Sequence, residues 1–328
     1  MKGEIILNQG TKESRADQTL LRDIYPVLSD RISSFLLKVP NTQLSGVEEI
    51  RLRAERPLMV CEGGQDYFLN ISGKQNEFTG GCIIVEKTDI DRTLQYMSDY
   101  SIYTLEDELR QGFLTLKGGH RVGLVGRVVP EQQEIRTIKN ISGMNIRIAR
   151  EIKGCALELT KEIFKDGIKH TLIASPPGCG KTTMLRDMIR LLSYGIRDTE
   201  IKGYKVGVVD ERSEIGGCYL GIPQRDLGPR TDVLDACPKA AGISLLIRSM
   251  GLDIVAVDEI GSMKDSEAIE EAIYSGVTII ATAHGKDMDE LLKKPGIRNL
   301  MEKNAFERVV ILSRARGPGT IASVLKIG

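Results

Sequence analysis

A glycine-containing segment that ends in Lys181 and Thr182 carries the clearest chemical signal in the sequence. It reads Ser175-Pro-Pro-Gly-Cys-Gly-Lys-Thr-Thr183, and it matches the phosphate-loop pattern G-x-x-x-x-G-K-[ST] except that Ser175 replaces the first glycine. Glycines let backbone N–H groups close around phosphate oxygens, and the N-terminus of a following helix adds partial positive charge. Lys181 would act on the β- and γ-phosphates, while the Thr182 hydroxyl would bind Mg²⁺.

This segment predicts a binding site for ATP and Mg²⁺. The backbone shape of the loop matters more here than the thiol of Cys179. A structural Gly/Pro turn before a helix is the alternative, and the Lys181-Thr182 pair argues against it. The residues expected at the nucleotide are Ser175, Pro176, Pro177, Gly178, Cys179, Gly180, Lys181, Thr182 and Thr183.

A second signal is the acidic pair Asp258-Glu259, which follows the apolar run 254–257. In a sheet that carries a phosphate loop, this is the Walker B position, at the carboxyl edge where ligands bind. Asp258 would hold Mg²⁺ through water, and Glu259 would polarise the attacking water as a catalytic residue. A solvated strand end is the alternative interpretation.

Further groups should reach the same edge. Asp210 and Glu211 end a neighbouring apolar strand, so Glu211 is a second candidate for activating water, while a buried salt bridge with Arg212 explains the pair equally well. His284 ends the apolar strand 277–283 and could sense the γ-phosphate through a hydrogen bond. An arginine supplied by another subunit would speed phosphoryl transfer, although an exposed surface role is the alternative for each candidate. The candidates are Arg121, Arg147, Arg150, Arg225, Arg230 and Arg248.

The elements that must position these residues alternate between strand and helix after residue 155, which indicates a parallel sheet. Residues 212–237 are rich in Gly, Pro and Arg and are expected to form an irregular loop. Helices are expected at 156–164, 184–192, 240–249 and 265–274. Strands are expected at 171–174, 204–211, 253–259, 277–284, 306–312 and 320–325, the last two as a hairpin.

The first 150 residues show antiparallel hairpin signals instead, with Gly-Gly turns at 63–64 and 118–119. Strands are expected at 47–53, 59–61, 67–69, 113–117, 120–125 and 145–150. Helices are expected from Asp17, with an interruption at Pro26, from Thr88, and from Thr104 to Gly112.

Together these patterns predict an α/β protein. Its main part is a RecA-like P-loop NTPase core with a mostly parallel sheet, and a smaller α+β domain precedes it. The expected divisions are a polar N-terminal segment and helix at 1–44, the α+β domain at 45–150, a linker at 151–154 and the P-loop ATPase domain at 155–328.

The composition argues against several classes of protein. Lys and Arg together number 45, as do Asp and Glu, and only 5% of the 328 residues are aromatic, which argues against nucleic acid as a partner. The six cysteines include no Cys-x-x-Cys pair, which favours free thiols in a reducing cytosol. We expect neither a signal peptide nor a membrane span, because no apolar run is long enough for either.

Several longer segments resemble the stage III sporulation protein AA family of endospore-forming Firmicutes, from about residue 45 to the C-terminus. That family is similar to the secretion-superfamily ATPases of type II and type IV systems. In this sequence, Asp210-Glu211 falls where those ATPases have an acidic box, and Ala283-His284-Gly285 falls where they have a histidine box. The segments that carry the resemblance are 49–53, 112–123, 145–151, 209–215, 230–235 and 257–261.

The resemblance implies a homohexameric ring with nucleotide between the two domains and neighbouring subunits, so that Arg147 and Arg150 become candidate catalytic contacts to phosphate. It also implies an ATPase, a phosphoanhydride hydrolase, that acts as a motor. The motor would energise a membrane-embedded channel or secretion-like complex during sporulation. It would work in the mother-cell cytoplasm, peripheral to the membrane through a partner.

Three other functions remain open. A RecA-like ATPase can depend on nucleic acid, although the charge and aromatic content argue against it. A GTP switch is disfavoured because no Asn-Lys-x-Asp segment follows the phosphate loop. An assembly scaffold that binds nucleotide with little turnover would have the same motifs.

Overall fold

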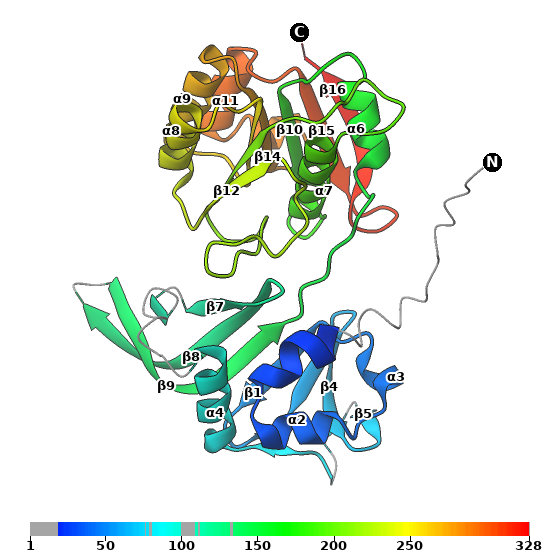
Figure 1. The fold of residues 1–328 in the computed structure, drawn as a ribbon, viewed down its shortest axis with the longest axis vertical. Coiled ribbons are helices and arrows are strands. Elements are labelled where there is room, and N and C mark those ends of the chain that lie inside the picture. Colours follow the sequence, from blue (N-terminus) through cyan, green and yellow to red (C-terminus); the bar gives the residue numbers. More distant parts are fainter. Residues whose placement is uncertain are drawn as a thin grey trace, which may run out of the picture. The chain divides into compact units, whose positions relative to one another are not determined.

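The computed structural model describes residues 19–75, 77–78, 81–99, 109–110, 112–131 and 134–327. The chain divides into two compact units, Met1–Ala149 and Arg150–Gly328, which Figure 1 draws as ribbons. The division falls beside the segment 151–154 that the sequence predicts as a linker.

The first unit is built on an antiparallel sheet with the strand order β5-β4-β3-β1-β9-β8-β7. The hairpins expected at the two Gly-Gly turns are confirmed as the pairs β3–β4 and β7–β8. A separate pair joins β2 (Arg56–Pro57) to β6 (Ile84–Val85). The main strands are β1 (Glu49–Arg53), β3 (Met59–Glu62), β4 (Gln65–Asn70), β5 (Gly73–Gln75), β7 (Phe113–Leu116), β8 (His120–Glu131) and β9 (Glu134–Arg147).

The helices of the first unit share one core with this sheet. Ile24, Ile32 and Ile90 are fully buried in a cluster that includes Ile50 and Val122 of the strands. The predicted boundary at residue 45 is therefore wrong for the described residues, because the helices before it complete the core of the sheet. The helices are the π-helical turn η1 (Leu20–Ile24), the 3-10 turn η2 (Tyr25–Val27), α2 (Asp30–Leu36), α3 (Asn41–Leu44) and α4 (Lys87–Met97).

Two predicted helix starts have different outcomes. The helix expected from Thr88 is present as α4, but its N-cap is Glu86, whose side chain forms a capping box with Asp89. The helix expected from Thr104 lies outside the described residues, apart from 109–110 and Gly112 at its end.

Strand β9 is much longer than the six residues predicted for it. It pairs with β8 from Arg121↔Arg147 to Glu131↔Glu134, with register shifts between Val125 and Arg127 and between Val129 and Pro130. Such irregularities break the two-residue alternation of side chains that identifies strands. Ile135, Ile138 and Ile141 accordingly recur every three residues, so the sequence gives no clear strand pattern there.

The second unit contains a sheet with the order β12-β11-β13-β14-β10-β15-β16, parallel except for the terminal pair β15–β16. Strand β12 lies within residues 212–237, which were expected to form only an irregular loop. It is a half-exposed edge strand without an apolar run, so its sequence carries little signal. The strands are β10 (Thr171–Ser175), β11 (Val206–Asp210), β12 (Thr231–Asp235), β13 (Ile254–Val257), β14 (Thr278–His284), β15 (Arg308–Ser313) and β16 (Thr320–Lys326).

Helices cover both faces of this sheet. Val255 and Val257 of β13 pack in a core with α8, α9 and α11, whereas Ile254 and Ala256 pack in a second core with α6 and α7. This alternation follows from the pleat, which points successive side chains to opposite faces. The helices are α6 (Leu157–Phe164), α7 (Lys181–Tyr194), α8 (Lys239–Ser249), α9 (Met263–Tyr274), α10 (Met288–Leu291) and α11 (Pro295–Glu302).

Across the part of the chain that the structure describes, every helix is too short or too polar to cross a membrane.

Candidate functional site

The loop between β10 and α7 has the backbone shape of a phosphate cradle. Gly178 and Gly180 have φ angles of +68° and +87°, in the left-handed region that favours glycine. Helix α7 begins at Lys181, so its N-terminus follows the loop directly. Ser175 is fully buried and its hydroxyl donates to the carbonyl of Pro176 at 2.7 Å. Because Ser175 has no positive φ, glycine is not required at this position.

Thr182 and Asp258 meet beside this loop. The Thr182 hydroxyl donates to Asp258 Oδ2 at 2.7 Å, and the Thr282 hydroxyl donates to Asp258 Oδ1. Thr282 belongs to β14, the strand that separates β13 from β10. A hydroxyl and a carboxylate in contact are oxygen ligands of the kind that Mg²⁺ uses together with phosphate oxygens and water. The residues present therefore fit the predicted magnesium position.

A chain of polar contacts joins Lys181 to the acidic residue after Asp258. Lys181 Nζ lies 3.1 Å from His284 Nδ1, and His284 Nε2 lies 2.9 Å from Glu259 Oε1. Arg212 Nη1 donates to the other carboxylate oxygen of Glu259 at 2.7 Å. If the ammonium donates to Nδ1, the neutral imidazole carries its proton on Nε2 and donates to Glu259. The structure thus brings together three of the predicted residues.

Burial changes the pKa of the Lys181 ammonium. The side chain is 6% exposed, and burial lowers its pKa from the ordinary value, although Asp258 and Glu259 act in the opposite direction. A buried cation without a carboxylate in direct contact is costly, so this position is suited to an anionic ligand.

Glu259 is held in an unusual backbone conformation. Its φ angle is +54°, in a region that non-glycine residues rarely adopt. Its N–H donates to the Thr282 hydroxyl at 2.9 Å, which helps to maintain this geometry. Strained residues of this kind are concentrated at functional sites.

The acidic pair at the end of β11 makes contacts other than those expected from the sequence. Asp210 is 2% exposed, and its carboxylate accepts N–H bonds from Glu214, Ile215 and Gly216 at 2.8, 3.0 and 2.8 Å. Burial raises the pKa of Asp210 while these N–H groups oppose the rise. Asp210 thus anchors the loop after β11.

Glu211 pairs with Lys239 at the start of α8, and no contact joins it to the Lys181–His284–Glu259 chain within the described residues. The alternative salt bridge between Arg212 and the pair Asp210-Glu211 is also wrong, because Arg212 binds Glu259. Of the two candidates for activating water, the geometry favours Glu259.

The anchoring role of Asp210 can be tested through stability. We expect Asp210→Ala to lower the free energy of unfolding by at least about 2 kcal/mol, because it leaves three N–H groups, two of them buried, without their acceptor. Urea denaturation followed by circular dichroism would measure the change. The control is Asp232→Ala at an exposed position of β12, where a change within about 0.5 kcal/mol is expected. Equal midpoints for the two variants would contradict the anchoring role.

The predicted arginines are spread over both units. Arg147 ends β9 in the first unit and lies 3.3 Å from a carboxylate oxygen of Glu49, whereas Arg150 begins the second unit. Arg230 donates to a backbone carbonyl at the end of α7, and Arg248 to a carbonyl of its own helix. The guanidinium of Arg121 stacks on the ring of Phe113, with its Cζ atom 3.6 Å from the ring centroid. Burial lowers the pKa of the last candidate, Arg225, to about 10.

Three residues that contact the candidate site or the loops beside it were not predicted from the sequence. Thr282 lies two residues before His284, so the period of a strand places both on one face and could have identified it. Arg186 lies four residues after Thr182 in α7, and its guanidinium donates to the carbonyls of Glu214 and Ile215. Arg314, which donates to the carbonyl of Gly178 at 3.0 Å, follows β15 and gave no sequence signal.

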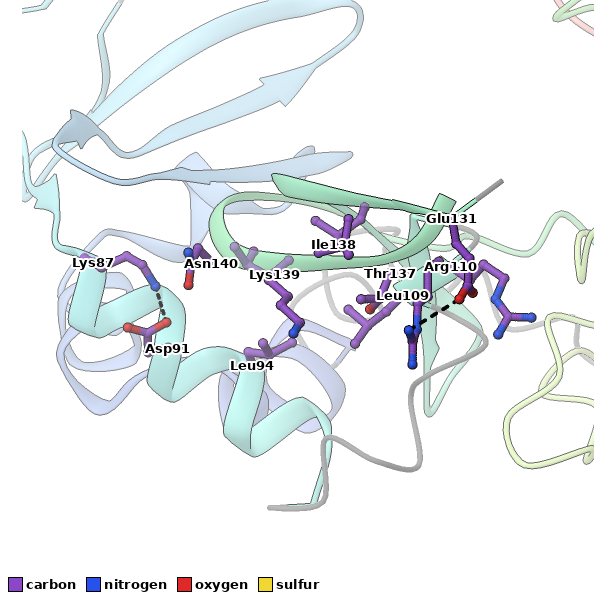
Figure 2. Close-up of a pocket in the computed structure, with 13 residues that line it drawn as sticks. Lys87, Asp91, Leu94, Leu109, Arg110, Glu131, Thr137, Ile138, Lys139 and Asn140 are labelled. Atoms are coloured by element: carbon purple, nitrogen blue, oxygen red, sulfur yellow. Dashed lines mark hydrogen bonds and ion pairs between the residues drawn. The ribbon is translucent and has the colours of Figure 1, made fainter. Parts of the chain in front are cut away.

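The first unit contains a cavity of about 1190 Å³ between α4 and the β8–β9 ribbon (Figure 2). Four of its charged lining residues form two ion pairs, Lys87 with Asp91 and Arg136 with Glu131. None of the predicted site residues lines this cavity, so the phosphate loop remains the candidate site.

A phosphate loop between β10 and α7, in a mostly parallel sheet whose strand β13 leads into Asp258, gives this chain the fold of the P-loop NTPases. More narrowly, the chain belongs to the family described as Sporulation stage III, protein AA, whose family model matches residues 18–327. It is 42% identical over 304 residues to Stage III sporulation protein AA of Bacillus subtilis (strain 168), covering 93% of this chain and 94% of that protein.

The chain also resembles solved structures at low sequence identity. The pilus retraction motor PilT with bound ADP matches at a TM-score of 0.57 and 14% identity, over 91% of this chain and 82% of that one. The ATPase DotB of Yersinia pseudotuberculosis matches at a TM-score of 0.54 and 14% identity, over 91% and 78% of the two chains. At these identities the likeness establishes the fold of the chain.

Proposed function

We propose that this protein is an ATP-hydrolysing motor that works as a ring oligomer, in a secretion-like or channel complex needed for endospore formation. The observation that carries the proposal is the convergence of Lys181, Thr182 and Asp258 with His284 and Glu259 at one sheet edge. A binding site for phosphate alone would not need a carboxylate connected to the cation through a histidine, whereas hydrolysis needs a general base near the phosphate. Membership of a sporulation family, and a fold shared with the motor PilT, support the biological setting.

The proposed reaction transfers the γ-phosphoryl group of ATP to water. The Glu259 carboxylate takes a proton from the water, whose oxygen bonds to the γ-phosphorus while the bond to the β–γ bridging oxygen breaks. The products are ADP and inorganic phosphate. Lys181 would stabilise the charge on the phosphate oxygens, and its position next to His284 links the phosphate site to the general base.

Thr182 and Asp258 would hold Mg²⁺, which supplies charge neutralisation at the phosphates when it is bound. In the structure the two side chains contact each other directly. With the metal bound, the Thr182 hydroxyl would be one of its ligands and would no longer donate to Asp258. His284 contacts Lys181 through Nδ1 and Glu259 through Nε2. It would therefore couple occupancy of the γ-phosphate position to the orientation of Glu259.

The oligomer is tested by measuring the ATPase rate per subunit across protein concentrations, with the mass followed by light scattering. We expect the rate per subunit to rise with the fraction of hexamer, because a neighbouring subunit would complete the site. Arg147 and Arg150 are the proposed contributors in trans. A constant rate per subunit from monomer to oligomer would contradict completion of the site by a neighbour.

The same assay separates the other functions. Hydrolysis that requires single-stranded nucleic acid and falls steeply with salt would replace the proposal with a nucleic-acid-dependent ATPase. Tight MgATP binding with negligible turnover at every oligomeric state would indicate an assembly scaffold instead.

A further inference from the structure

The loop of the terminal hairpin packs directly on the outer side of the phosphate loop. Arg314, the first residue after β15, donates from Nε to the carbonyl of Gly178 at 3.0 Å. At the other end of the hairpin loop, Gly319 donates its N–H to the carbonyl of Cys179 at 2.8 Å. A methyl group placed on Gly180 would lie 3.2 Å from the nitrogen of Gly319, so the two loops are in close contact.

These two bonds orient the phosphate cradle. In a planar trans peptide, the carbonyl of one residue and the N–H of the next point in opposite directions. Because the carbonyls of Gly178 and Cys179 point to the hairpin loop, the N–H groups of Cys179 and Gly180 point away from it. Neither N–H has an acceptor in the described part of the chain. The hairpin loop therefore supports the phosphate loop from its carbonyl side and leaves the N–H groups of Cys179 and Gly180 for a ligand.

Strand order places this loop on a particular side of the ligand. Parallel β14 flanks β10 on one side and carries His284, with β13 and Asp258 beyond it, whereas parallel β15 flanks β10 on the other side. The carboxyl ends of these parallel strands meet at one edge. In the proposed function, the γ-phosphate and metal occupy the side of β13 and β14. The remaining part of a nucleotide, its ribose and base, then extends toward the side of β15.

The side chain of Arg314 can form the contacts that a ribose and a base offer. Its side chain is exposed and, within the described residues, forms no ion pair. Among contacts within the described part of the chain, only Nε is bonded, so the terminal N–H groups and the flat face of the guanidinium are available beside the cradle. A methyl group on Gly178 would lie 3.0 Å from Nη2, which shows how closely the guanidinium approaches the loop. Arginine stacks on aromatic faces and hydrogen-bonds oxygen acceptors, both of which a nucleoside offers.

We propose that the hairpin loop from Arg314 to Gly319 is the nucleoside-binding wall of the phosphate site, with Arg314 contacting the base and ribose of the nucleotide. This inference rests on the proposed function, because it assumes that the cradle holds a nucleoside triphosphate. It makes Arg314 a determinant of nucleotide affinity in the same subunit as the phosphate loop.

Calorimetric titration of the full chain with MgATP, MgADP and magnesium tripolyphosphate tests the assignment. Arg314→Ala should weaken binding of MgATP and MgADP about tenfold, and should change binding of tripolyphosphate, which lacks a nucleoside, by less than about twofold. Arg314→Lys keeps a donor and the charge but loses the flat guanidinium, so it should show the same pattern with a smaller loss. If Arg314→Ala fails to fold, this second variant decides the test.

The matched control is Arg197→Ala, which removes one exposed positive charge beyond the far end of α7. It should bind all three ligands as the wild type does. Equal weakening of all three ligands by the Arg314 variants would show that Arg314 acts only through charge or loop shape, and would overturn the assignment, as would unchanged binding of all three. If the wild type itself binds neither MgATP nor tripolyphosphate, the proposed function fails instead.

Discussion

Replacing Lys181 by alanine is expected to reduce steady-state ATP turnover by about 10²-fold or more. The side chain is the buried cation at the start of α7, and its ammonium lies 3.1 Å from His284. Its removal takes away the positive charge that the phosphate loop places in contact with His284 of the His284–Glu259 pair. We expect phosphate binding to weaken as well, because backbone N–H groups alone carry only partial charge.

The measurement is phosphate release at saturating MgATP, with circular dichroism as the check on folding. The Thr182–Asp258–Thr282 contacts do not involve Lys181, so the sheet edge should stay intact. The control is Lys165→Ala, since Lys165 is an exposed lysine just after α6, and its turnover should match that of the wild type. Wild-type turnover in Lys181→Ala would refute catalysis at this loop.

Strong local patterns made much of the second unit predictable. The apolar runs that became β10, β13 and β14 are buried on both faces, so each reads as continuous hydrophobic sequence. The motif residues at their carboxyl ends then follow from the topology, because parallel strands end at one edge. Lys181, Asp258 and His284 could be brought together by this reasoning alone.

Other parts depend on tertiary context that a single sequence does not display. Asp210 and Asp258 both follow buried strand residues, yet Asp210 accepts three backbone N–H bonds whereas Asp258 accepts from two threonine hydroxyls. The contact of Arg314 with Gly178 spans 136 positions and has no motif. The positive φ of Glu259 likewise reflects its bond to Thr282 on another strand, not a local preference.

Glu259→Gln is expected to leave MgATP bound and to slow its hydrolysis by about 10² to 10⁴-fold, the usual contribution of a general base. Glutamine keeps the shape of glutamate and an oxygen that can still accept from His284. It loses the charge that pairs with Arg212 and the ability to take a proton from water. Single-turnover hydrolysis measured beside nucleotide affinity separates the two effects.

Glu211→Gln is the matched control, since it makes the same chemical change at the other acidic strand end. Glu211 is paired with Lys239, outside the contact chain of Lys181, His284 and Glu259, so its variant should retain hydrolysis within about threefold. The opposite ranking, with normal turnover in Glu259→Gln and a large loss in Glu211→Gln, would move the base to β11. It would also require the Glu211–Lys239 pair to break when nucleotide binds. The comparison therefore tests both the identity of the base and whether this resting arrangement is close to the active one.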